Sequence, residues 1–269
     1  MKVSIITVTN RWGGIDIAWS SLKKQTFKDF EWILLDKHYH ARSKEVAEFV
    51  NDDRLKHYPI HPPKGPEIWD LNRAYNQAVR LSTGDLIISF QDYIWLEKEQ
   101  VDKFVYLAKE LGPGNWITGC GHKGQLPDLL GDKEGLLTIF HSNREAEPIG
   151  FSYMDNRVFG QKEPQQVDLT WFELNWACFW KKDLYAIGGF DEELDRLCYG
   201  CDNLSLADRA HRIGHKFWID RSNKVYGFPH EKYFPRPEDW EEKHGNKGAY
   251  SRRLKDYENN PVLPFLSGK

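Results

Sequence analysis

The sequence predicts an α/β protein with a central, mostly parallel sheet flanked by helices, and three observations support this prediction. Apolar segments of strand length alternate with helical segments from the start, over residues 3–8, 15–24 and 30–35. A strand, helix and strand at this spacing are typical of a right-handed parallel crossover. Residues 86–90 form a continuous apolar or small run, as expected of a strand buried on both faces. A chain of 269 residues is also long enough to bury a sizeable core.

The remaining elements follow in chain order. We expect further strands over residues 55–60, 116–120, 173–180, 216–219 and 224–228. We expect further helices over residues 43–50, 67–81, 98–111, 182–187 and 202–213. Ser43 is the predicted N-cap of the first of these, and Gly214 follows the last as its C′ residue. Residues 122–168 lack periodicity and suggest an irregular insertion.

Composition excludes several classes of protein. A formal net charge of −3 gives no field that would attract nucleic acid or an anionic membrane. No apolar run approaches the roughly 18 residues that span a bilayer. The chain opens directly on a strand without a signal peptide, so we expect a cytoplasmic protein. Eleven Trp residues favour stacking on flat apolar faces, although most are expected in the core.

Four cysteines are too few for a disulfide scaffold in a chain of this length. Cys198 and Cys201 have the spacing of a redox or zinc pair. No second Cys pair or His-x-His set completes a tetrahedral site around them. We therefore expect neither a zinc nor a redox role for this pair.

One carboxylate, Asp92, stands at the end of the predicted central strand. Ligands of open α/β sheets bind beyond the carboxyl ends of the strands, which makes Asp92 a candidate ligand. The alternative is an ordinary Asp in a strand-ending turn. No Gly-x-Gly-x-x-Gly follows the first strand, and no P-loop sequence occurs, so dinucleotide and P-loop sites are not supported.

Five separated segments share their order with one known pattern. They are residues 4–11 with an Asn-Arg turn, residues 30–36 ending in Asp, residues 76–84 ending in Gly, residues 187–192 (Ile-Gly-Gly-Phe-Asp-Glu), and residues 201–203 (Cys-Asp-Asn) followed by Arg209 and Gly214. Together they resemble the GT-A fold glycosyltransferases of the family 2 type. The resemblance implies an inverting hexosyltransferase that uses a UDP- or GDP-sugar donor and a hydroxyl acceptor, such as a glycan. It also implies a catalytic domain over residues 1–230, with a nucleotide-binding half over about 1–120, an acceptor half over 121–230 and a C-terminal arm over 231–269.

The resemblance further implies a donor site and a metal. The nucleotide-sugar-binding residues would be Thr7, Thr9, Asp36, Asn76, Gln91 and Asp92. Departure of the leaving group places charge on the donor's diphosphate, and a divalent cation offsets such charge. Asp92 and His230 would be the metal ligands, and an imidazole ligand would favour Mn²⁺ over Mg²⁺.

An inverting transfer needs a general base within reach of the acceptor hydroxyl. The resemblance assigns this role to Asp202, which opens a predicted helix, and an N-cap is the structural alternative. Asp191 is the second candidate base and, with Trp176 and Trp180, a candidate for the acceptor site. Arg209 follows two turns along the same helix and would bind near the base or form an ion pair.

The chain departs from the family pattern at three positions. The usual metal-binding Asp-x-Asp is reduced to Gln91-Asp92-Tyr93, Cys201 replaces the usual Glu before the catalytic Asp, and Lys37 replaces a second Asp after the second strand. The loss of Asp-x-Asp favours a non-catalytic sugar- or protein-binding module as an alternative. A nucleotidyltransferase needs an early basic, glycine-rich loop, and residues 9–14 offer only Arg11 with two glycines.

Overall fold

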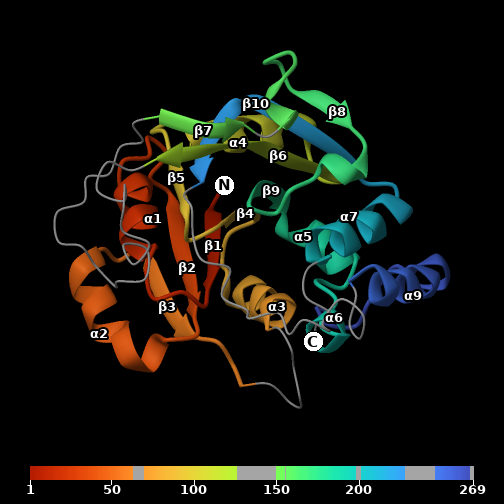
Figure 1. Cartoon of the computed structure of the whole chain (residues 1–269), viewed down its shortest axis with the longest axis horizontal. Coiled ribbons are helices and arrows are strands. Elements are labelled where there is room, and N and C mark those ends of the chain that lie inside the picture. The colour runs from red at the N-terminus through yellow and green to blue at the C-terminus, as the bar shows by residue number, and fades with distance from the viewer. Residues whose placement is uncertain (63–69, 126–149, 155, 198–200, 228–245, 267–269) are drawn as a thin grey trace.

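The computed structural model describes residues 1–62, 70–125, 150–154, 156–197, 201–227 and 246–266 (Figure 1). The strands are β1 (Val3–Thr9), β2 (Phe30–Asp36), β3 (Leu55–Pro59), β4 (Leu86–Phe90), β5 (Ile94–Leu96), β6 (Asn115–Gln125), β7 (Gly150–Met154), β8 (Gln165–Val167), β9 (Trp176–Trp180) and β10 (Lys216–Gly227). The helices are α1 (Ile15–Leu22), α2 (Tyr39–Val50), α3 (Leu71–Leu81), α4 (Gln100–Leu111), α5 (Lys181–Ala186), α6 (Leu194–Leu197), α7 (Asp202–Arg212) and α9 (Asn246–Asn259). Two single 3₁₀ turns, η3 (Asn156–Val158) and η4 (Leu169–Trp171), complete the described elements.

All ten described strands belong to one sheet. Its order is β3-β2-β1-β4-β9-β6-β10-β5, with β7 paired to β6 and β8 paired to β10. The first four strands in this order are mutually parallel. The sheet then becomes mixed, because β9 runs antiparallel to both of its neighbours, β4 and β6.

The antiparallel course of β9 determines what meets at the end of β4. Trp176, the first residue of β9, pairs with Phe90, the last residue of β4. The chain that enters β9 therefore reaches the edge of the sheet at which the parallel strands β1, β2 and β4 end. This edge is where ligands of α/β sheets bind.

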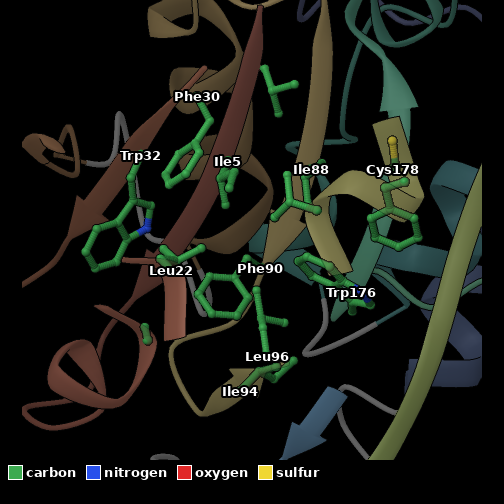
Figure 2. Close-up of a cluster of buried hydrophobic side chains, with 14 of the residues drawn as sticks. Ile5, Leu22, Phe30, Trp32, Ile88, Phe90, Ile94, Leu96, Trp176 and Cys178 are labelled. Atoms are coloured by element: carbon green, nitrogen blue, oxygen red, sulfur yellow. The ribbon is translucent and has the colours of Figure 1, made fainter. Parts of the chain in front are cut away.

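Both faces of the sheet are covered, as alternate residues of the strands show. Ile5 and Ile88 belong to a core that α1, α2 and α4 cover, and Figure 2 shows them beside Trp32 and Trp176. Ile6, on the opposite face of the sheet, belongs to a second core, which α3, α5 and α7 cover. Because successive strand residues point to opposite faces, β1 contributes to both cores. In Figure 1, α1 and α2 lie beside β2 and β3, and α5, α7 and α9 lie at the other side.

The sequence located most elements, and it misplaced several boundaries. Residues 86–90 form the central strand as predicted, and Gly214 follows α7 with a φ of +91°. By contrast, α2 begins at Tyr39, before the predicted N-cap Ser43, and its first turn carries Arg42, whose buried side chain is ion-paired with Asp36. Within the described part of 122–168, β6 extends to Gln125 and β7 and β8 join the sheet, so these residues are more regular than predicted.

Two other strands differ from the prediction. The two short strands predicted after α7 are one strand, β10, with an irregular register between Ile219 and Lys224. The three-residue strand β5 was not predicted, because a run of that length carries no usable periodicity. It pairs with β10 at the end of the sheet order.

Candidate active site

A cavity of about 220 Å³ lies at the carboxyl ends of β1 and β4. Residues after these strands, the start of α3, the chain before β9 and the first turn of α7 surround it. Its lining residues are Val8, Asn10, Arg11, Ile60, Asp70, Leu71, Gln91, Tyr93, Glu173, Leu174, Asn175, Asp202 and Asn203. Two of the predicted site residues, Gln91 and Asp202, are among them.

Asp202 is the first residue of α7 and lines the cavity. The preceding Cys201 has a left-handed backbone with a φ of 63°, which turns the chain into the helix. Burial raises the pKa of the Asp202 carboxyl, although the backbone N–H groups of Asp202 and Asn203 act to lower it. A carboxylate with a raised pKa at a cavity wall accepts a proton more readily than one in water.

Asp92 lies behind the cavity wall. Its side chain is fully buried, and it is absent from the lining although Gln91 and Tyr93 on either side of it are present. The hydroxyl of Thr9 donates to one carboxylate oxygen at 2.5 Å, and the Arg11 guanidinium donates to the other at 2.5 Å. Both oxygens are thus bonded to protein donors.

Arg11 connects this buried carboxylate to the cavity. Its side chain is 17% exposed, and its guanidinium carbon lies 5.1 Å from the ring centroid of Tyr93. Its Nε atom is buried and has no hydrogen-bond partner among the described residues. The guanidinium therefore sits between Asp92 and the cavity with donors to spare.

Two other acids of the lining are neutralised by cations outside it. Lys37 lies 3.0 Å from a carboxylate oxygen of Asp70, and Arg157 lies 2.8 Å from one of Glu173. Lys37 was singled out as a departure from the family pattern, and its observed role is this ion pair. Of the three acids that line the cavity, Asp202 is the one that forms no ion pair with another described residue.

A hydrogen bond to a buried tyrosine holds the Gln91 side chain in place. Its side-chain amide donates to the hydroxyl of Tyr75 at 3.0 Å, and that hydroxyl lies 3.1 Å from the Ser89 hydroxyl. The Tyr75 ring stacks on Phe190 with centroids 4.7 Å apart. Burial raises the pKa of Tyr75, so its phenol stays protonated.

Asn76 and Asp36, predicted at the donor site, are satisfied inside the protein. The Asn76 amide donates to the carbonyl of Phe190 at 2.9 Å and accepts from the N–H of the same residue at 2.8 Å. Asp36 accepts two bonds from Arg42, of 2.8 and 2.7 Å, and lies 2.9 Å from His57. Burial alone would raise the pKa of Asp36, but the bonds from His57 and Arg42 hold it below the usual value. Neither side chain lines the cavity, and their roles at the donor site stay predictions.

Thr7, Trp176 and Trp180 lie among core residues instead of at the cavity. Thr7 is fully buried, and its hydroxyl accepts a 2.9 Å bond from the indole of Trp32. Trp176 is 2% exposed, donates to Asn223 at 2.8 Å and lies within the core of Figure 2. Trp180 packs partly buried against the same core. The positions of Trp176 and Trp180 follow from the large apolar area of their indole rings, which stabilises the fold most when it is packed.

Asp191 does not line the cavity either. It is 1% exposed, and Arg253 and Tyr257 of α9 both bond to its carboxylate. Arg209 is buried beneath this contact and donates to the carbonyl of Ile187 at 3.0 Å. Asp191 therefore attaches α9 to the body of the protein, and Asp202 remains the candidate base.

The predicted metal ligands and the cysteine pair are only partly visible. His230 and Cys198 lie outside the described residues. Among the described residues, no three His, Cys, Asp or Glu side chains form a group that would hold a metal ion. Burial and then the charge of Asp202 raise the pKa of Cys201, which keeps its thiol protonated.

The sequence matches the glycosyl transferase family 2 profile over residues 4–161, which is more than half of its length. The chain belongs to glycosyl transferase family 2. This membership confirms the resemblance drawn from the five segments. None of the curated proteins matches this glycosyltransferase in sequence.

Solved structures agree on the fold of this glycosyltransferase. S. aureus TarS 1-349 in complex with UDP has a TM-score of 0.61 and 15% identity, with 99% of this chain and 71% of that one covered. The same protein with UDP-GlcNAc has a TM-score of 0.63 and 14% identity, with 99% and 72% covered. GalNAc-T7 with UDP, GalNAc and Mn²⁺ has a TM-score of 0.64 and 12% identity, with 98% and 55% covered. The GT-A fold of the glycosyltransferase is thereby confirmed.

Several cavity residues escaped sequence reasoning. Glu173, Leu174 and Asn175 reach the cavity because β9 runs antiparallel beside β4, and the backbone N–H of Gln91 donates to the Asn175 carbonyl at 3.3 Å. No local pattern predicts that arrangement. Arg11 could have been predicted as a site residue, because the Asn-Arg turn directly follows the first strand. Among the described helices of the glycosyltransferase, none combines the length and apolar character needed to cross a bilayer.

Proposed function

We propose that the protein transfers a sugar from a UDP- or GDP-sugar to an acceptor hydroxyl with inversion at the anomeric carbon. Membership of glycosyl transferase family 2 supports the reaction class. The observation that carries the proposal is Asp202, a carboxylate with a raised pKa at the wall of the cavity where β1 and β4 end. We further propose residues 1–230 as the catalytic domain and residues 231–269 as an arm on it.

In the proposed reaction Asp202 acts as the general base. Its carboxylate takes the proton of the acceptor hydroxyl while the hydroxyl oxygen bonds to the anomeric carbon. The bond between that carbon and the diphosphate oxygen breaks on the opposite face, and the nucleoside diphosphate leaves with the electron pair. Attack from one face and departure from the other inverts the configuration. Gln91, Asn175 and Asn203 supply polar groups to the cavity for orienting the sugar.

The Mn²⁺ or Mg²⁺ expected from the resemblance does not fit the described residues. Asp92 would be a ligand, but its carboxylate is fully buried and both of its oxygens are bonded, to Thr9 and Arg11. His230, the second expected ligand, lies outside the described residues. GalNAc-T7, which shares the fold, was crystallised with Mn²⁺. We assign no step of the reaction to a metal.

A panel of UDP- and GDP-sugars tests the proposal. Each donor is incubated with the protein, with EDTA or with Mn²⁺, and slow donor hydrolysis and nucleoside diphosphate release are followed. We expect slow hydrolysis of one donor, and faster release of its nucleoside diphosphate when a suitable glycan acceptor is added and receives the sugar. Binding without hydrolysis of any donor would favour a non-catalytic binding module, for which the buried Asp92 is the supporting observation. Release of pyrophosphate from a nucleoside triphosphate with a sugar phosphate would instead indicate a nucleotidyltransferase.

A further inference from the structure

The positive charge that faces the donor site in this structure belongs to an arginine. Arg11 is the one cation among the described residues that line the cavity. It follows β1, so it stands at the strand ends where the diphosphate of a donor is expected. Its guanidinium presents five N–H donors, of which the described contacts use one, to Asp92.

Asp92 has the geometry of a residue that positions Arg11. Its 2.5 Å bond to the guanidinium is charge-assisted, and its second oxygen takes the Thr9 hydroxyl at 2.5 Å. Thr9 also accepts the backbone N–H of Arg11 at 3.2 Å, so the strand end and the side chain are fixed together. A metal ion bound to this carboxylate would lie beside the positive charge of Arg11, which opposes it.

Arg11 lines the cavity with its charge paired to Asp92, and the acids of the lining bear on whether an anion fits beside it. Asp70 and Glu173 would oppose an anion, but Lys37 and Arg157 neutralise them. A planar guanidinium binds phosphate oxygens through two parallel hydrogen bonds, which a spherical ammonium does not.

We propose that Arg11, held by Asp92 and Thr9, binds the diphosphate of the donor and takes the place of a divalent metal ion. This assignment rests on the proposed glycosyl transfer. As the sugar departs, negative charge grows on the diphosphate, and a preorganised guanidinium stabilises that charge. Asp92 is then a positioning residue, and nucleoside diphosphate binding requires no divalent cation.

Calorimetric titration of UDP and of GDP tests the assignment, in EDTA and separately with Mn²⁺. We expect one of them to bind in EDTA with a dissociation constant within about twofold of that in Mn²⁺, and Arg11→Gln to weaken it about tenfold or more. Arg11→Lys keeps the positive charge but loses the planar guanidinium, so its affinity for the nucleotide should lie between those of the wild type and Arg11→Gln. The control Arg212→Gln removes an exposed arginine that pairs with Asp208, and should leave binding unchanged.

A second readout separates phosphate binding from folding. Ligand-observed NMR with the parent nucleoside, which lacks phosphate, should show the same binding to Arg11→Gln as to the wild type. If UDP and GDP bind only with Mn²⁺, or if Arg11→Gln binds as well as the wild type in EDTA, the assignment is overturned and the proposed function stands. If neither nucleotide binds under either condition, the proposed function fails and the assignment fails with it.

Discussion

The hydroxyl of Tyr257 in α9 donates a 2.6 Å hydrogen bond to the buried carboxylate of Asp191, 66 residues earlier in the chain. Arg253, one turn before Tyr257, donates to the same oxygen at 2.7 Å. The tyrosine hydroxyl also lies 2.7 Å from the hydroxyl of Ser205 in α7. One buried acid of the Gly-Gly-Phe-Asp turn thus attaches the C-terminal helix to the body beside the helix of the candidate base.

Removal of this hydroxyl should destabilise the fold. Tyr257→Phe keeps the ring but deletes a hydrogen bond to a buried charge, which costs about 2 kcal/mol of unfolding free energy. Urea denaturation followed by circular dichroism measures the loss. The control Tyr106→Phe alters a tyrosine that is 72% exposed and should change stability by less than about 0.5 kcal/mol. Equal stability of the two variants would contradict the attachment role of Tyr257.

Replacement of the candidate base should separate catalysis from donor binding. Asp202→Asn keeps the shape of the side chain but removes its basicity, so kcat for transfer should fall about 10²- to 10⁴-fold. Donor affinity should change little, because the general base acts on the acceptor. Asp208→Asn, on the same helix and paired with Arg212, is the matched control and should keep its activity. A near-wild-type rate for Asp202→Asn would rule out the base assignment.

The rate of transfer should depend on pH through Asp202. Burial raises the pKa of its carboxyl, and a general base works only when deprotonated. The rate at saturating donor and acceptor should therefore rise with pH, with a midpoint above the ordinary aspartate value of about 4. Initial rates across the acidic range measure the midpoint. A rate that falls as pH rises through this range would contradict the role of the carboxylate as a base.

The same raised pKa affects stability with a definite sign. Because the folded protein binds the Asp202 proton more tightly than the unfolded chain, this contribution is fully present below the unfolded value and is lost as pH rises through the folded value. At neutral pH the buried, ionised carboxylate of Asp202 destabilises the folded protein, and Asp202→Asn removes this destabilisation. We expect a higher Tm for Asp202→Asn than for the wild type at pH 7 and a smaller difference below about pH 4. Calorimetric melting at both pH values tests this, and a lower Tm at pH 7 would contradict it.

Sequence reasoning succeeded where one segment carries its own signal. The buried run of β4 and the helix that opens at Asp202 are local features, and the structure has both. It did not predict contacts between residues that are far apart in the chain. Asp92 accepts a hydrogen bond from Arg11, 81 residues earlier, and Asn76 donates one to Phe190, 114 residues later. A residue pattern shows which groups reach the end of the sheet, but the side on which each one packs is decided by tertiary contacts.

The turn that occupies Asn76 offers a sharp test of these tertiary contacts. Gly189 has a φ of +86°, and a Cβ built on it would lie 2.4 Å from the Asn76 side-chain oxygen and 2.5 Å from Cγ of Leu266. Gly189→Ala should therefore cost both backbone strain, about 1–2 kcal/mol, and the hydrogen bonds that Asn76 makes to Phe190. Gly214→Ala has a similar φ of +91° but meets open space, so it should show the strain alone. We expect Gly189→Ala to be less stable than Gly214→Ala by at least about 1 kcal/mol in urea denaturation. Equal losses would mean that Asn76 contributes nothing to the turn.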